Sequence, residues 1–188
     1  LCNGDTTTIT VTASGGTAAY TGTGIFTQLA GTYSYVITDA NGCTTSTSVT
    51  ITEPPAIVTS VTSTNALCNG DSNGSIDLTV SGGTGPFTFD WNSGAYTTED
   101  LTGIPAGTYA GTLTDANGCT NSGTITITEP SVLIPSISTS TDPSTCSGTD
   151  GIINITFAGG TAAYSFLWNN AATSEDLTGV GDGNYFCT

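Results

Sequence analysis

Six cysteines are the most reactive side chains in this sequence of 188 residues, and the accompanying residue types limit their chemistry. There is no His, Lys or Arg, so no Cys-His or Ser-His catalytic pair and no His-ligated zinc site can form. No Cys-x-x-Cys spacing supports a cysteine-only metal site. The composition is of an extracellular type, and there an even number of cysteines predicts disulfides. We expect this for Cys2, Cys43, Cys68, Cys119, Cys146 and Cys187.

Asp and Glu carry all the side-chain charge, and 15 of them give a formal net charge of -15. Without Lys or Arg the chain cannot neutralise phosphates, which excludes nucleic-acid binding by the usual electrostatic route. The sequence also has no apolar run long enough to span a membrane. Nucleic acid and a membrane span are therefore excluded as partners.

Three loops of the form Asp-x-Asn-Gly each place a carboxylate two residues before an amide. They contain Asp39 and Asn41, Asp71 and Asn73, and Asp115 and Asn117. Calcium prefers such oxygen ligands, and the chain supplies no basic side chain as a counterion. The competing interpretation is a turn in which Asp and Asn cap the bend and Gly adopts a positive φ. We favour the turn because no distal Glu completes an EF-hand loop, so no cofactor is required and calcium remains the alternative.

Two adjacent carboxylate pairs are the remaining candidates for catalysis, Glu99-Asp100 and Glu175-Asp176. Neighbouring residues on a strand point to opposite faces, which places these pairs poorly for paired acid–base chemistry. We expect them to be solvated charges that discourage aggregation at a sheet edge. With no base beside a nucleophile, the sequence predicts that the protein is not an enzyme.

The sequence repeats itself with a period of about 76 residues. Cys-Asn-Gly-Asp begins at Cys2 and again at Cys68, and Thr-Glu-Pro ends at Pro54 and again at Pro130. Three tyrosines spaced by 76 residues mark the period: Tyr33, Tyr109 and Tyr185. We therefore expect a partial repeat without its first strand, a complete repeat, and a partial repeat without its last strands, at 1–55, 56–130 and 131–188.

Within a repeat, apolar and polar residues alternate with a period of two. Ile76, Leu78 and Val80 are one such set, and Thr and β-branched residues are abundant throughout. This pattern predicts antiparallel strands. In the complete repeat we expect them at 56–66, 75–81, 86–92, 95–101, 107–114 and 120–128. Asn117-Gly118 predicts a type I′ turn between the last two.

Six or seven short strands in about 76 residues predict a small immunoglobulin-like β-sandwich. The fold class is therefore all-β, with tandem antiparallel sandwich repeats stacked head to tail. Trp91 and Trp168 fall on the third strand, where immunoglobulin domains place a core Trp. Tyr109 and its equivalents Tyr33 and Tyr185 follow a chain corner and resemble a tyrosine corner. The alternative is that all five are ordinary core aromatics.

Taken in order, these motifs resemble the SprB-type repeat of large surface adhesins of gliding Bacteroidota. The resemblance rests on Cys-Asn-Gly-Asp, Ser-Gly-Gly-Thr, the Trp strand, Ala-Gly-Thr-Tyr, Asp-Ala-Asn-Gly-Cys and Thr-Glu-Pro, and it covers essentially the whole chain. It implies a secreted, cell-surface protein of tandem repeats used in adhesion, motility or matrix. The chain departs from the pattern in two repeats: the first has no Trp, and in the third Cys187 replaces the equivalents Tyr35 and Gly111.

The sandwich topology constrains how the cysteines pair. Cys68 precedes the second strand at one end, and Cys119 lies in the last hairpin at the other end. A strand of about eight residues is roughly 25 Å long, whereas a disulfide needs Cα atoms within about 7 Å. We therefore favour Cys2–Cys119, a bridge between adjacent repeats. The alternative is Cys2–Cys43 and Cys68–Cys119 within repeats, which a different β-topology would allow.

The remaining cysteines follow from the same argument. Cys68 would pair with a hairpin cysteine beyond Thr188, and Cys43 with a repeat before Leu1. Cys146 and Cys187 lie at the same end of the third repeat, so we expect that they could pair within it.

These expectations favour a structural function outside the cell. The chain would be a segment of a long surface fibre or adhesin stalk, a rigid rod whose partners are neighbouring repeats and other copies in a filament. The alternative is an adhesin module that binds surface glycans or another ligand, with calcium, through Gly-Gly-Thr loops at 15–17, 82–84 and 159–161. Asp5-Thr6-Thr7 resembles an O-glycosylation acceptor pattern of Bacteroidota, with Thr6 as the acceptor.

Overall fold

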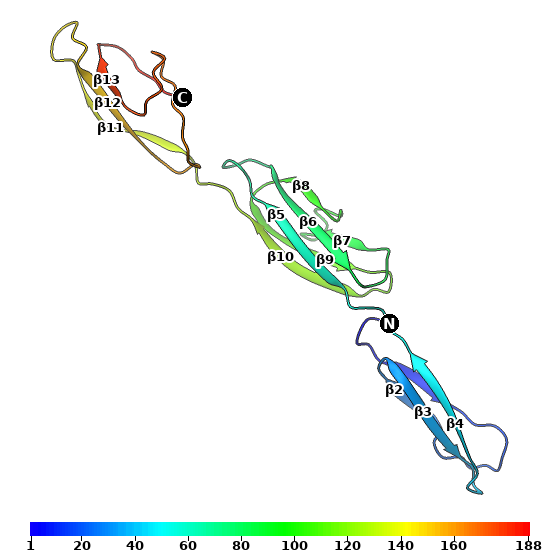
Figure 1. Ribbon diagram of the computed structural model, residues 1–188. Coiled ribbons are helices and arrows are strands. Elements are labelled where there is room, and N and C mark those ends of the chain that lie inside the picture. The colour runs from blue at the N-terminus through cyan, green and yellow to red at the C-terminus, as the bar shows by residue number, and fades with distance from the viewer. The chain divides into compact units, whose positions relative to one another are not determined.

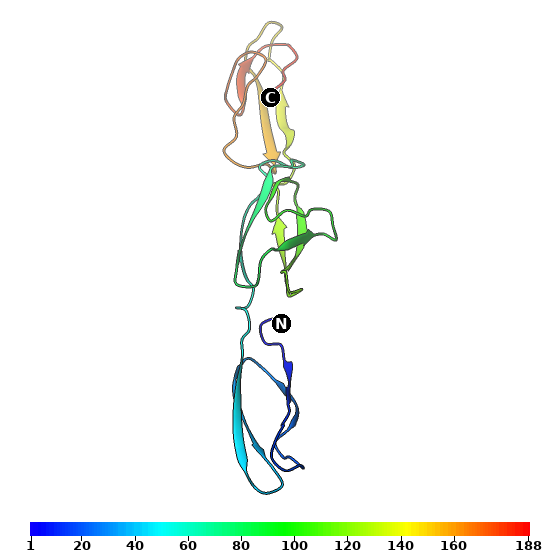
Figure 2. The same cartoon turned by 90° about the vertical axis from the view of Figure 1, so that its right-hand side faces the viewer.

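A computed structural model describes all 188 residues, which form strands β1 to β13 and no helix (Figures 1 and 2). Five pairs of strands are antiparallel: β1 with β2, β3 with β4, β7 with β9, β11 with β12, and β12 with β13. This confirms the all-β, antiparallel fold predicted from the alternation of apolar and polar residues. None of the elements is a helix long and apolar enough to cross a membrane.

Contacts between Cα atoms divide the chain into two compact units. The first comprises Leu1–Thr62, Ile76–Leu101 and Thr108–Ile125. The second comprises Ser63–Ser75, Thr102–Gly107 and Thr126–Thr188. The middle repeat contributes strands to both units.

The first repeat forms two antiparallel strand pairs. β1 (Thr7–Val11) pairs with β2 (Gly24–Gln28), and β3 (Gly31–Thr38) pairs with β4 (Thr44–Ile51). Alternation buries Val11 of β1 and Ile37 of β3. Phe26 of β2 packs on Tyr35 of β3 with 4.7 Å between ring centroids, so an aromatic pair links the two sheets.

The middle repeat forms two three-stranded sheets. One has the order β5-β6-β8, from β5 (Val58–Thr64), β6 (Gly74–Ser81) and β8 (Leu101–Ile104). The other has the order β10-β9-β7, from β7 (Thr88–Trp91), β9 (Gly107–Thr114) and β10 (Thr120–Ile127). Leu78, Trp91 and Leu113 are buried in its core. Strands β5 and β10 each lie at the edge of a sheet, which leaves one side of the sandwich without hydrogen bonds between strands of the two sheets.

The third repeat forms one three-stranded sheet with the order β11-β12-β13. Its strands are β11 (Ile134–Thr141), β12 (Gly151–Ala158) and β13 (Leu177–Val180). Trp168, Leu177 and Val180 form a buried cluster on which Ile153 and Tyr185, among others, pack. A Trp is therefore the centre of the apolar cluster here as well.

The strand predicted at 95–101 is wrong, because the chain turns there instead. Asn92, Ser93 and Gly94 all have positive φ, which ends β7 directly after Trp91. The next strand is β8, in which Leu101 and Ile104 are buried and Gly103 between them has a φ of 67°. The periodicity of 95–101 did not reveal this tight turn.

The type I′ turn predicted at Asn117-Gly118 is also wrong. A type I′ turn needs positive φ at both central residues, but only Gly118 has one, at 83°. Gly118 N donates to Asp115 O at 3.0 Å, and Asp115 N donates to Cys119 O at 2.9 Å. This pattern fits a type I turn followed by a glycine bulge. The Asp115 carboxylate, which accepts from Asn117 N at 2.8 Å, favours this geometry.

Candidate functional site

The first candidate site is a disulfide that joins two repeats. Cys2 precedes β1 of the first repeat, and Cys119 lies in the hairpin between β9 and β10 of the middle repeat. Their Cα atoms are 5.5 Å apart, and 117 positions separate them in the sequence. This is the pairing that the sandwich topology favours. It excludes both Cys2–Cys43 and Cys68–Cys119, because each sulfur forms one disulfide.

A glutamate holds the loop that carries Cys2. Glu53 Oε1 accepts from Asn3 Nδ2 at 3.1 Å, and Glu53 Oε2 accepts from Gly4 N at 2.6 Å. Asn3 Nδ2 also donates to Pro54 O at 3.2 Å. We call this arrangement the glutamate clasp. It fixes the start of the repeat to its end, beside the Pro54-Pro55 linker that leads into the next repeat.

The same clasp occurs in the middle repeat with nearly identical distances. Glu129 Oε1 accepts from Asn69 Nδ2 at 2.9 Å, and Glu129 Oε2 accepts from Gly70 N at 2.7 Å. Pro130 O accepts from Asn69 Nδ2 at 3.1 Å. This contact was not predicted from the sequence, although Cys-Asn-Gly-Asp and Thr-Glu-Pro recur together. Their joint recurrence was the signal that the two motifs meet.

The hairpin that carries Cys119 is braced by Asp115, a largely buried carboxylate. Asp115 Oδ1 accepts from Cys119 N at 2.9 Å, and Asp115 Oδ2 accepts from Thr84 N at 3.0 Å. Burial raises the pKa of Asp115, but hydrogen bonds from Cys119, Thr84 and Asn117 outweigh it and hold the pKa below its ordinary value. The carboxylate is therefore ionised at neutral pH and ties the hairpin to the Gly-Gly-Thr loop.

Asp39 has the equivalent role in the first repeat. It accepts from Thr17 N at 3.1 Å, from Cys43 N at 2.8 Å and from Asn41 N at 2.9 Å. Hydrogen bonds from Thr17 and Cys43, above all, lower the pKa of Asp39. Both hairpins thus use an Asp to cap backbone N–H groups.

The third predicted calcium loop is held in a similar way by donors from the protein. Asn73 Nδ2 donates to Asp71 Oδ2 at 3.1 Å, and Asn73 Oδ1 accepts from Leu67 N at 2.9 Å. Asp39, Asp71 and Asp115 do not come together, and the structure contains no group of three acidic, Cys or His side chains that could hold a metal. The observed contacts are those of capped turns.

The other four cysteines are unpaired in the structure. Cys43, Cys68 and Cys146 are exposed, whereas Cys187 is half-buried opposite Trp168. The expected Cys146–Cys187 pair is therefore not formed. Gly148 O lies near Gly181, so the loop of Cys146 is beside that part of the chain. Cys187 lies six residues beyond Gly181, where it pairs with Trp168 in an isolated antiparallel bridge.

The predicted core aromatics lie in equivalent environments. Trp91 and Trp168 are both buried, and their Nε1 atoms donate to Thr98 O at 3.0 Å and Ser174 O at 2.9 Å. The tyrosines of the predicted corner are Tyr33, Tyr109 and Tyr185. Tyr33 and Tyr185 are half-buried and donate to the carbonyl four residues upstream, as in a tyrosine corner. Tyr109 is buried, and burial is the main cause that raises its pKa.

The adjacent carboxylate pairs have a structural role that was not predicted from the sequence. Asp100 Oδ1 accepts from Leu78 N at 2.9 Å, and Asp176 Oδ1 accepts from Ile155 N at 3.0 Å. One member of each pair thus binds the backbone of a core strand.

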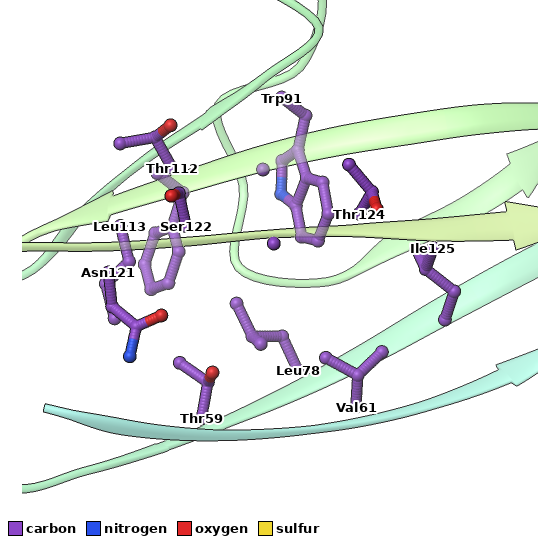
Figure 3. A pocket seen from close by; sticks show the side chains of 13 residues that line it. Thr59, Val61, Leu78, Trp91, Thr112, Leu113, Asn121, Ser122, Thr124 and Ile125 are labelled. Carbon is purple, nitrogen blue, oxygen red and sulfur yellow. The ribbon is translucent and has the colours of Figure 1, made fainter.

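The second candidate site is an apolar hollow of about 150 Å³ in the middle repeat (Figure 3). Leu78, Phe89, Trp91 and Leu113 contribute its inner wall. Residues of the edge strands β5 and β10 line its outer part. The hollow therefore lies on the side of the sandwich where the two sheets are not joined.

The SprB repeat model matches the chain at 60–96 and at 138–173. These two segments are SprB repeats. Each match runs from the first strand of a repeat past its core Trp, so the family match covers the equivalent region twice. No curated protein matches the chain.

The SprB repeat belongs to cell-surface adhesins and is not an enzyme family. The match to this repeat suggests that the chain is a segment of a cell-surface adhesin, located at the cell surface or outside the cell.

Proposed function

We propose that this segment of SprB repeats is a load-bearing spacer of the adhesin, a rigid rod whose joints are locked covalently. The observation that carries the proposal is the Cys2–Cys119 disulfide, which spans the Pro54-Pro55 linker. A linker with two prolines is stiff by itself, since each ring fixes its own φ. A covalent bridge beside it removes the remaining freedom to hinge.

The disulfide also changes the path of a pulling force. Force that enters at Leu1 passes from Cys2 to Cys119 through the sulfur atoms and then along β10. The residues between the two cysteines lie outside this path, so they carry no load while the bond is intact. A repeat chain built this way would resist extension without relying on the strength of each sandwich.

The glutamate clasp is a second, independent observation that supports the proposal. Glu53 and Glu129 hold the cysteine-bearing loops of successive repeats in the same geometry. Cys68 is thereby placed at the end of the middle repeat as Cys2 is at the end of the first. We propose that Cys68 is the cysteine through which the middle repeat joins a following one, and that Cys43 accepts a bridge from a preceding one.

Single-molecule extension of the full chain, held at its two ends, tests the proposal. The 117 positions between the cysteines correspond to roughly 400 Å of chain at about 3.4 Å per residue. We expect this length to appear only after reduction, and to appear without reductant in a Cys2→Ser, Cys119→Ser double variant. A Cys43→Ser variant is the matched control and should behave like the original chain. Equal extension before and after reduction would contradict the proposal.

We further propose that Thr6 carries an O-glycan in the native adhesin. Thr6 is exposed, and it follows Asp5 in the acceptor pattern. Mass spectrometry of the peptide containing Thr6, taken from native material, tests this, and an unmodified peptide would refute it.

A further inference from the structure

Two of the residues that line the apolar hollow of the middle repeat are glycines. Gly111 on β9 and Gly123 on β10 both line it. A Cβ built on Gly123 would meet no atom within 4 Å. In the first repeat the equivalent positions are Tyr35 and Thr47, which are paired across β3 and β4. The first repeat therefore carries side chains at two positions where the middle repeat has none.

The walls of the hollow are apolar and aromatic. Trp91, Leu78, Val61 and Ile125 surround it in Figure 3. None of its lining residues is ionisable, and the whole chain carries a net charge of -15 without one Lys or Arg. An anionic ligand would therefore find no positively charged side chain in the hollow. A cationic ligand would lose its hydration there and find no carboxylate to compensate for the loss.

One end of the hollow offers a hydrogen-bond acceptor. Asn121 Nδ2 donates to Ile57 O at 3.0 Å, which fixes the orientation of the amide. Its oxygen points toward the space between Trp91 and Leu78 (Figure 3). A hydroxyl group on a ligand could donate to this oxygen while the rest of the ligand contacts the apolar wall.

We propose that this hollow is a binding site for a small, uncharged aromatic molecule of one ring that carries a hydroxyl group. A cavity of about 150 Å³ lined by apolar side chains is large enough for a benzene-sized molecule. The indole of Trp91 and the ring of Phe89 provide aromatic contacts to its ring. Asn121 Oδ1 accepts the hydrogen bond from its hydroxyl group. No step of this proposal depends on the load-bearing function.

Titration of the full chain with 4-methylphenol, followed by the backbone amide NMR signals of Gly111 and Gly123, tests the site. We expect saturable shifts of both signals. A Gly123→Val variant places a side chain at the mouth and should lose these shifts. Thr47→Val is the matched control, because it puts the same residue at the equivalent position of the first repeat. It should retain the ligand-induced shifts of Gly111 and Gly123. Shifts that do not saturate, or that persist in Gly123→Val, would overturn the proposal and leave the hollow a packing gap only.

The role of Asn121 is tested separately because Asn121→Ala leaves the hollow open. Loss of one neutral hydrogen bond predicts about five-fold weaker binding of 4-methylphenol, with unchanged binding of toluene, which has no hydroxyl. The anion 4-methylbenzoate should not bind to either protein. Equal effects of Asn121→Ala on the two neutral ligands, or binding of the anion, would overturn the proposed ligand class.

Discussion

The indole of Trp91 lies against Gly111, the residue opposite it on the neighbouring strand β9. A Cβ built on Gly111 would stand 2.6 Å from Cζ3 of Trp91 and 2.7 Å from its Cε3. In the first repeat, which has no Trp, Tyr35 occupies this position and packs on Phe26. In the third repeat Cys187 lies opposite Trp168. The residue at this position is thus small where the repeat has a Trp and large where it has none.

Gly111→Ala should destabilise the protein by about 1–3 kcal/mol, because the added methyl group overpacks a rigid indole. The measurement is the free energy of unfolding in urea. Gly123→Ala is the matched control, since its Cβ would meet no atom within 4 Å and the change favours a strand slightly. If the two variants were equally stable, the contact between Trp91 and Gly111 would not be the reason for this glycine.

The disulfide predicts a second difference in stability. In the chain-entropy model, a loop of 117 residues closed by Cys2–Cys119 contributes about 4–5 kcal/mol, and measured effects are often smaller. We therefore expect the Cys2→Ser, Cys119→Ser double variant to lose about 3–5 kcal/mol in urea unfolding under non-reducing conditions. Cys68→Ser removes an exposed, unpaired thiol and should change nothing. A double variant as stable as the original would show that the bridge does not constrain the unfolded chain.

The glutamate clasp predicts local effects at Gly4 and Gly70, whose N–H groups donate to carboxylates. Glu129→Gln replaces one carboxylate oxygen by a donor, so the Gly70 N–H should exchange with solvent faster and the protein should lose about 1 kcal/mol. Amide hydrogen exchange of Gly70 and Gly4 measures this in one experiment, because the intact clasp of Glu53 is an internal control. Unchanged protection of Gly70 would argue against the clasp.

Much of the fold was predictable because it depends on nearest-neighbour alternation. Ile76 and Leu78 are both buried in β6, as the period of two predicts. The prediction of a strand at 95–101 was wrong because the chain turns just before it, where Asn92 and Ser93 adopt positive φ. Composition alone does not indicate such a turn. The prediction of a type I′ turn at Asn117 was wrong for a related reason. The Asp115 side chain binds the backbone of the loop and selects a turn that the Asn-Gly pair does not prefer.

The candidate sites were less predictable than the fold. The Cys2–Cys119 disulfide could be inferred because the rise per residue of a strand and the Cα–Cα distance of a disulfide are both known. The clasp joins residues about 50 to 60 positions apart, and no local pattern indicates such a contact. The hollow has open space beside Gly123, and a glycine in a strand predicts weakness or a bulge before it predicts a cavity.

Acid should weaken the protein through Asp39 and Asp115. Hydrogen bonds in the folded chain hold the pKa of each below its ordinary value of 3.8. Because the folded pKa is the lower one, their stabilisation is fully present above the ordinary value and is lost as the pH falls through the folded value. Melting temperatures between pH 7 and pH 2 should therefore fall most steeply below about pH 4. An Asp39→Asn, Asp115→Asn variant should have a lower melting temperature at pH 7, because an amide is a weaker acceptor of backbone N–H groups than a carboxylate. Its melting temperature should also fall less between pH 4 and pH 2. Asp182→Asn, at an exposed position, is the control. If the melting temperatures of all three proteins fell equally at low pH, Asp39 and Asp115 would not be the cause of the acid sensitivity.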